Sequence, residues 1–359
     1  MAHGAAVSTV AGLSARVLRL PLRRPWGPDV PRVHVIEVVL TTSDGADGRG
    51  FSWTPTIGAG AVHALLTQDI AEWLVGRPAE PEVVWDGLWR HLHEAGSGGV
   101  TTIALAGVDL ALWDLRGRRA GLGLTDLLGR RHDSAEVYGS GVNLHYSLDE
   151  LVAQAERWVD TGHGAVKMKV GRPSLDEDVE RVAAVREVLG PRRRLMVDAN
   201  QRWDLPTARR AIAALAPYDL YWVEEPLLAD ATWAYAELRR ATGVPIALGE
   251  NAHTIHRFRD LLDAGACDVV QPNVVRVGGI TPFLRIVALA RSYGVSVAPH
   301  LLPELSGQLA LTLPEPTIVE DVEDASFAAL GCLAEPSGVV IADARLTAAT
   351  APGLGLRFA

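Results

Sequence analysis

Two hydrophobic patterns alternate along the chain from about residue 136 onward. Short runs of apolar and β-branched residues are separated by Ala-, Leu- and Arg-rich stretches in which apolar positions recur at helical spacing. Strands that alternate with helical stretches of ~10–15 residues are typical of βαβ units and a parallel sheet. The predicted strands cover 137–139, 165–170, 195–197, 220–223, 245–248, 268–270, 295–298 and 317–319. The predicted helices cover 147–161, 176–189, 205–215, 232–242, 256–264 and 281–293. Eight such strands close into a barrel, so the pattern predicts an α/β barrel domain over residues 133–325.

Residues 1–132 have a different pattern, which predicts a separate α+β domain. Apolar runs at 17–20 and 33–41 indicate strands, and a turn-rich segment at 44–50 leads into a short run at 51–53. Long helical stretches follow, notably 101–118. The tail, residues 326–359, is rich in glycine and proline, and we expect it to return to the first domain.

The composition argues against two classes of function. The chain has 359 residues, with 34 Lys and Arg against 43 Asp and Glu, and it has no dense basic block that would mark a nucleic-acid surface. No stretch of ~18 apolar residues indicates a membrane span, and the N-terminus lacks a signal-peptide pattern. The two cysteines, Cys267 and Cys332, fit no disulfide framework. We expect a cytoplasmic homo-oligomer that acts on a small molecule and contacts neither nucleic acid nor membrane.

A polar or ionisable residue lies at the carboxyl end of each predicted barrel strand. These residues are spaced 20 to 29 positions apart, which is about one strand–helix unit. The carboxyl ends of barrel strands meet at one rim, where barrel enzymes carry their catalytic residues. The residues are Ser140, Lys169, Asp198, Glu224, Glu250, Asn273, His300 and Glu320.

Three of these residues, Asp198, Glu224 and Glu250, follow consecutive strands. Three carboxylates that converge in one pocket repel one another unless a cation joins them. Ligands that are all oxygen favour Mg²⁺ over zinc. The alternative, that each carboxylate caps the following helix, is weaker for three residues in series. The sequence therefore predicts a magnesium site.

Two lysines, Lys167 and Lys169, lie two positions apart on one predicted strand and should point to the same side of it. Burial and like charge both lower a lysine pKa, which makes a lysine usable as a base near neutral pH. A solvated lysine pair is the alternative, but a central barrel strand disfavours it. His300 belongs to the same rim and is a second acid/base candidate.

Substrate specificity should depend on loops around the rim. The first-domain loops at 25–31 and 53–60 contain Trp26 and Trp53, which could cover the barrel mouth or only pack the domain. Asn143, His145 and Arg276 are further candidates for substrate contact. Loop chemistry varies too freely for these residues to name a substrate.

The chain resembles the enolase superfamily, specifically the mandelate racemase subgroup, along nearly its whole length. The segments that carry the resemblance are Ala106–Asp114, Lys167–Lys169, Val197–Gln201, Val223–Pro226, Gly249–Asn251, Arg276–Thr281 and Ala298–His300. The resemblance implies a modified (β/α)7β barrel with a capping domain built from the N-terminal region and the C-terminal tail.

The resemblance also implies roles for individual residues. Mg²⁺ would be held by Asp198, Glu224 and Glu250. Lys169 would be one acid/base, tuned by Lys167, and His300 would be the acid/base on the opposite face of the substrate. Glu320 would donate a hydrogen bond to the substrate carboxylate, and Ser140 and Asn200 match substrate-contacting positions.

Two segments, Leu195–Asp204 and Arg276–Leu284, look most like dehydratases of the talarate/galactarate type, whereas Gly249–Asn251 is similar to mandelate racemase. One residue departs from the family pattern, because Asn273 stands where an aspartate usually accompanies the histidine. We expect a magnesium-dependent enzyme that removes the proton beside a carboxylate and dehydrates an acid sugar to a 2-keto-3-deoxy acid. A racemase or epimerase of a 2-hydroxy acid is the alternative, and a non-catalytic barrel scaffold is a remote one.

Overall fold

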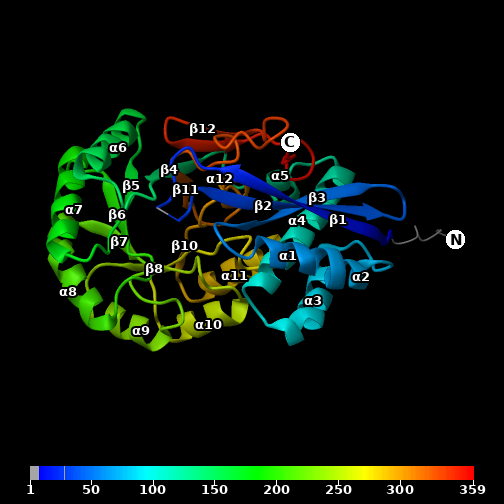
Figure 1. Cartoon of the computed structure of the whole chain (residues 1–359), viewed down its shortest axis with the longest axis horizontal. Coiled ribbons are helices and arrows are strands. Elements are labelled where there is room, and N and C mark those ends of the chain that lie inside the picture. The colour runs from blue at the N-terminus through cyan, green and yellow to red at the C-terminus, as the bar shows by residue number, and fades with distance from the viewer. Residues whose placement is uncertain (1–7, 28) are drawn as a thin grey trace.

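The computed structural model describes residues 8–27 and 29–359, and it contains a parallel barrel beside a smaller cap (Figure 1). Pro28, in the predicted specificity loop, lies outside the described residues. The barrel strands pair in the order β4 to β10, and β11 pairs with β4. Thr317, just before β11, donates a hydrogen bond to the Val297 carbonyl of β10 at 2.5 Å. The strands are β4 (Ala135–Ser140), β5 (Ala165–Lys169), β6 (Arg194–Asp198), β7 (Leu220–Glu224), β8 (Ile246–Leu248), β9 (Val269–Val270), β10 (Ser296–Val297) and β11 (Ile318–Val322).

One helix follows each of the first seven barrel strands, and β11 leads instead into a hairpin. The helices are α6 (Leu148–Asp160), α7 (Leu175–Leu189), α8 (Leu205–Leu215), α9 (Thr232–Ala241), α10 (Ile255–Asp263), α11 (Ile280–Ser292) and α12 (Pro303–Ala310). A short 3₁₀ turn, η3 (Ala216–Tyr218), follows α8. This order is the expected (β/α)7β barrel.

Helix α12 has no counterpart among the helices predicted from the sequence. All eight of its residues are buried, including Glu304, Ser306 and Gln308, so it has no solvent-exposed face that an amphipathic pattern could mark. By contrast, α6 begins with a capping box between Ser147 and Glu150, and α8 and α10 begin with side-chain caps from Asp204 and Thr254. A helix with a solvent face and a capping residue can be predicted from the sequence pattern. A fully buried helix such as α12 lacks this pattern, so it was not predicted.

The cap is an antiparallel three-stranded sheet covered by helices. Its strands are β1 (Val10–Pro21), β2 (Arg32–Thr42) and β3 (Asp47–Thr54). Its helical elements are α1 (Ala59–Leu65), η1 (Leu66–Ile70), α2 (Ala71–Leu74), α3 (Pro81–Leu92), η2 (His93–Ala95), α4 (Val100–Ala120) and α5 (Leu124–Leu128).

The predicted turn segment at 44–50 is wrong in its second half, because β3 already begins at Asp47. The glycines that suggest a turn serve close packing instead. A Cβ atom on Gly48 or Gly50 would collide with the backbone of α4. Glycine in a strand often marks such a close approach of another backbone.

The C-terminal tail contacts both parts of the molecule. Its hairpin, β12 (Val339–Ala342) and β13 (Arg345–Ala348), pairs with β4 and so extends the barrel sheet. Beyond the hairpin the chain reaches the cap, where the Phe358 ring packs edge-on against Phe51. In the part of the chain that the structure describes, none of the helices combines the length and apolarity needed to span a bilayer.

A buried aspartate on α4 joins the cap to the barrel. The Asp109 carboxylate accepts hydrogen bonds from the Thr281 hydroxyl at 2.6 Å and the Thr281 backbone N–H at 3.0 Å. The Trp113 indole N–H also donates to the Thr281 hydroxyl, at 3.0 Å. Burial raises the Asp109 pKa to about 7 because a low-dielectric site disfavours the charged form.

This pKa predicts how stability depends on pH. Between about pH 4 and pH 7 the unfolded chain ionises Asp109 while the folded chain keeps its proton. The contribution of Asp109 to the free energy of unfolding therefore falls as pH rises, by up to about 1.4 kcal/mol per pH unit. Asp109→Asn removes this contribution, so its stability relative to the unsubstituted protein should improve from pH 5 to pH 7. Urea unfolding at both pH values measures it, and a pH-independent difference would contradict the assignment.

Candidate active site

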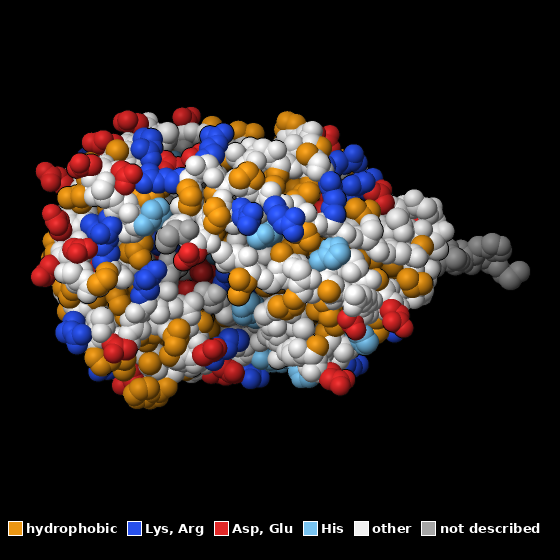
Figure 2. Space-filling view, viewed as in Figure 1, with side chains coloured by type: hydrophobic (Ala, Val, Ile, Leu, Met, Phe, Trp, Pro, Cys, Tyr) orange, Lys and Arg blue, Asp and Glu red, His pale blue; other side chains and the backbone are white. Residues whose placement is uncertain are grey.

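The barrel mouth, where its strands end, is a hollow next to the cap, with acidic side chains at its floor (Figure 2). The sheet register places three of the predicted residues side by side there. Lys169 of β5 pairs with Asp198 of β6, and Asp198 pairs with Glu224 of β7. Residues that are paired across adjacent strands point to the same side of the sheet, so these three side chains lie close together inside the barrel.

The two lysines are buried among carboxylates. Lys167 Nζ lies 2.6 Å from Glu224 Oε1 and 2.8 Å from Glu320 Oε1. Lys169 Nζ lies 2.5 Å from Asp198 Oδ2. Both lysines therefore face the same cluster of acidic groups, as their spacing on the strand predicts.

The prediction that both lysines have lowered pKa values is wrong for this structure. Burial does lower the pKa of each lysine, and Lys167 also lowers that of Lys169. The surrounding carboxylates together outweigh these effects. The pKa of Lys169 is raised above its ordinary value, chiefly by Asp198, and that of Lys167 well above it, chiefly by Glu224 and Glu320.

The three predicted metal ligands differ in their partners. Besides Lys167, Glu224 accepts hydrogen bonds from Gln271 Nε2 at 2.6 Å and Trp222 Nε1 at 3.2 Å. Burial raises the Glu224 pKa to about 7. Asp198 accepts the Asn200 backbone N–H at 2.8 Å.

Glu250 lies next to His300, whose Nε2 is 2.7 Å from Glu250 Oε2. Ligand-type atoms of Glu224, Glu250 and His300 all lie within 4.8 Å of one another, while Asp198 is held by Lys169. The lysines and His300 thus neutralise the acidic groups in this structure. Three acidic oxygen donors that otherwise require buried cations fit a hard divalent cation such as Mg²⁺.

His300 is held at both ends of its ring. Nδ1 lies 3.0 Å from Asn273 Nδ2, and Nε2 also lies 3.6 Å from Glu320 Oε2. Burial lowers the His300 pKa, but Glu250 and Glu320 raise it more, so the net shift is upward. The ring therefore contacts Glu250 and Glu320, whereas Lys169 contacts Asp198.

The donor role implied for Glu320 toward a substrate stays a prediction, and toward the protein Glu320 is an acceptor. Glu320 Oε1 accepts from the Ser140 hydroxyl at 2.7 Å and from Lys167, and Oε2 accepts from the Leu301 N–H at 3.0 Å. Burial raises its pKa, but Lys167 and His300 lower it to about 2. A carboxylate with these partners is an acceptor, and Ser140 is occupied by Glu320 instead of pointing freely toward a substrate.

Two family models match the chain. Residues 15–129 match the mandelate racemase/muconate lactonizing enzyme N-terminal domain, and residues 150–359 match the enolase C-terminal domain-like family. The chain belongs to the mandelate racemase/muconate lactonizing enzyme family. It is an enzyme, and the family resemblance seen in the sequence is confirmed.

Individual relatives of this family come from several bacteria. The 3,6-anhydro-α-L-galactonate cycloisomerase of Streptomyces coelicolor is 39% identical over 90% of this chain and 88% of its own. The L-talarate/galactarate dehydratase of Salmonella typhimurium is 38% identical over 79% of this chain and 71% of its own. The L-talarate dehydratase of Polaromonas sp. JS666, solved with Mg and L-glucarate, has a TM-score of 0.87 at 36% identity and covers 98% of this chain and 95% of that chain.

The other substrate-contact candidates of this family member differ in exposure. Asn143 is fully buried, accepts the Lys169 backbone N–H at 2.8 Å and donates to Gln154 at 2.8 Å. It therefore helps to hold β5 in place, and both its amide oxygen and its amide nitrogen are bonded to protein groups. Asn200 is exposed at the mouth. Arg276 is half-buried and donates to the Glu250 carbonyl at 3.2 Å and to Asn251.

The aromatic candidates lie on the cap side and on the loop after β4. Trp53 is buried, and the half-buried Trp26 ring lies 6.2 Å from it. Trp26 lines a small cavity together with Arg24 and Gly141. His145 is exposed, with its ring edge-on to Tyr146 at 4.9 Å.

Sequence reasoning missed four residues that support the predicted ligands. Gln271 and Trp222 both donate to Glu224, and each has a signal in the sequence, because each lies two positions before another site residue on the same strand or loop. Glu225 is buried beside Glu224 with a left-handed φ of 37°. Both its oxygens accept from Asn251 Nδ2, at 3.0 and 2.7 Å, and Asn251 also donates to Glu250 at 3.0 Å.

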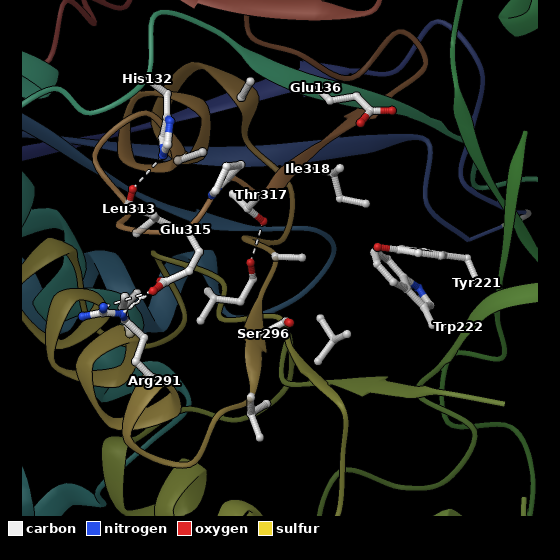
Figure 3. A pocket seen from close by; sticks show the side chains of 18 of the residues that line it. His132, Glu136, Tyr221, Trp222, Arg291, Ser296, Leu313, Glu315, Thr317 and Ile318 are labelled. Carbon is white, nitrogen blue, oxygen red and sulfur yellow. Dashed lines mark hydrogen bonds and ion pairs between the residues drawn. The ribbon is translucent and has the colours of Figure 1, made fainter. Parts of the chain in front are cut away.

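A separate cavity of about 880 Å³ opens at the opposite end of the barrel, where the strands begin (Figure 3). Its walls include two ion pairs, Glu136 with Arg194 and Arg291 with Glu315. Trp222 lines this cavity, while its indole N–H bonds Glu224 on the active-site side. The residues that line it include none of the predicted catalytic groups, so we do not expect the chemistry in this cavity.

Proposed function

We propose that this enzyme removes the α-proton of an acid-sugar carboxylate in a Mg²⁺-dependent reaction and eliminates the β-hydroxyl, giving a 2-keto-3-deoxy acid. The observation that carries the proposal is the position of Lys169 and His300. They contact Asp198 and Glu250 respectively, so two groups able to exchange protons are bonded to different members of one cluster of carboxylates. A carboxylate substrate bound at this cluster has a potential base on one face and a hydrogen-bond donor on the other.

The residues of the site divide the chemistry between them. Lys169 takes the α-proton, and the C–H electron pair forms an enediolate with the substrate carboxylate. Asp198, Glu224 and Glu250 would hold Mg²⁺, whose positive charge would lower the Lys169 pKa and would stabilise the enediolate. His300 directs Nε2 toward the β-oxygen. The β C–O bond then breaks as His300, in its charged form, gives the Nε2 proton to the departing oxygen, which leaves as water. The ring regains a proton from solvent, and the enol product tautomerises to the 2-keto acid.

Ring opening is a second candidate, favoured by the identity to the Streptomyces coelicolor cycloisomerase over most of both chains. The first step is the same removal of the α-proton. The leaving group is then the ether oxygen of an anhydro ring, which stays attached to the product, so no water is lost. Racemisation would instead require His300 to act as a base.

Incubation of the Mg²⁺-loaded enzyme with sugar mono- and diacids and with 3,6-anhydro acids, followed by NMR in D₂O, tests these alternatives. A 2-keto-3-deoxy product with loss of water supports dehydration. A 2-keto-3-deoxy product formed from an anhydro acid without loss of water supports ring opening. Interconversion of C2 epimers with no keto product would overturn both.

A further inference from the structure

The amide of Asn273 can point in only one direction. Asn273 lies just after β9 and is fully buried. Its Oδ1 accepts the backbone N–H groups of Val275 and Arg276, both at 3.1 Å. If the amide were rotated by 180°, its NH₂ group would face the Val275 and Arg276 N–H groups. Donors would then face donors, and none of these three groups would have an acceptor there. A buried donor without a partner costs about 1–3 kcal/mol. The NH₂ group of Asn273 is therefore directed at His300.

This direction determines where His300 carries its proton. An amide NH₂ only donates, so the His300 Nδ1 atom, 3.0 Å away, must accept. A neutral imidazole with a bare Nδ1 carries its hydrogen on Nε2. The contact at Nε2 is consistent with a hydrogen on that atom, because Nε2 lies 2.7 Å from Glu250 Oε2, which is an acceptor. In the charged form both nitrogens carry hydrogen, so Nε2 has one in either form.

We propose that Asn273 is a positioning residue that fixes His300 as the Nε2–H tautomer, so that the ring can donate to a substrate but cannot take a proton from carbon. The proposal rests on the proposed function for its consequence, which is that Lys169 is the sole base. An aspartate at this position would accept from Nδ1–H and leave Nε2 bare, which is the arrangement of a histidine base. Asn273 thus restricts the enzyme to one C2 configuration and to elimination.

The replacement Asn273→Asp is a sharp test because it changes one group. Aspartate keeps an oxygen for Val275 and Arg276 and exchanges the NH₂ that faces His300 for an acceptor. Asn200→Asp is the matched control, since it adds the same charge at the mouth on a residue bonded to Asp198 and not to the ring.

The first measurement is ¹⁵N NMR of histidine-labelled, Mg²⁺-loaded protein, titrated to the alkaline limit where the ring is neutral. His300→Gln identifies the His300 signals among the 11 histidines. We expect a bare Nδ1 and a protonated Nε2 in the unsubstituted protein and in Asn200→Asp, and the reverse in Asn273→Asp. A protonated Nδ1 with a bare Nε2 in the unsubstituted protein, or no reversal in Asn273→Asp, would overturn the proposal.

The second measurement is exchange of the α-proton into D₂O with two acid sugars that differ only at C2. The unsubstituted enzyme should exchange one epimer, and Asn273→Asp should exchange the other at least about tenfold faster than the unsubstituted enzyme does, as expected for a gained general base. Comparable exchange of both epimers by the unsubstituted enzyme would overturn the proposal. If no acid sugar exchanges at all, the proposed function fails, while the NMR measurement still decides the tautomer because it needs no substrate.

Discussion

Lys169→Met is expected to lose essentially all turnover, by about 10³-fold or more, together with exchange of the α-proton on the Lys169 face. Methionine is close in size to the lysine side chain but cannot accept a proton, and a positioned general base contributes about 10²–10⁴-fold. Steady-state kinetics and proton exchange into D₂O measure the two losses. A variant that retains a tenth of the activity would show that Lys169 is not the base.

The control for this variant is magnesium binding. Lys169 contacts Asp198 Oδ2, so its loss removes a counter-charge from one proposed ligand and should not weaken the affinity for Mg²⁺. Titration calorimetry with Mg²⁺ measures this affinity. Much weaker binding in Lys169→Met would mean that the variant has damaged the metal site, and the kinetic loss could not be assigned to the base.

Removal of Mg²⁺ by chelation is expected to abolish activity and to lower the melting temperature, and added Mg²⁺ should restore both. Four buried carboxylates, those of Asp198, Glu224, Glu250 and Glu320, lie close together, and a cation that binds only the folded state adds stability. At 100 times its dissociation constant this addition is about 2.7 kcal/mol. Differential scanning calorimetry with and without EDTA measures the shift.

Glu250→Gln tests whether Glu250 itself is a ligand of Mg²⁺. The amide retains the shape of the side chain and loses its charge, so the variant should fold and show a much smaller Mg²⁺-dependent shift in melting temperature than the unsubstituted protein. An equal shift in both proteins would exclude Glu250 as a ligand. Full activity after chelation would exclude the metal role of the whole cluster.

The charge state of Lys169 depends on the same carboxylates that are proposed to bind Mg²⁺. Burial alone would lower the pKa of Lys169, but the carboxylates raise it above its ordinary value. A lysine in that state is protonated near neutral pH and cannot accept a proton. The carboxylates that hold Lys169 charged include the proposed magnesium ligands, so bound Mg²⁺ would supply positive charge for the enediolate and would lower the pKa of the proposed base.

The sequence by itself determined the barrel and the ring of polar residues at its mouth. Both follow from local pattern: parallel strands buried on both faces are continuous apolar runs, and the residue after each run lies at the same rim in every unit. The secondary-structure prediction failed at helix α12 and at the start of β3, where the local hydrophobic pattern does not indicate the element. Helix α12 is buried on all sides, and β3 contains glycines that admit the backbone of α4.

Only the tertiary structure decided what the site residues do to one another. The raised lysine pKa values, the acceptor role of Glu320 and the burial of Asn143 all depend on groups from distant strands, and charge and hydrogen bonding act through space, not along the chain. Asn273 illustrates the difference between what the sequence determines and what the tertiary structure determines. Its departure from the family is visible in the sequence, but the direction of its amide depends on the Val275 and Arg276 N–H groups and on a ring that is 27 residues away.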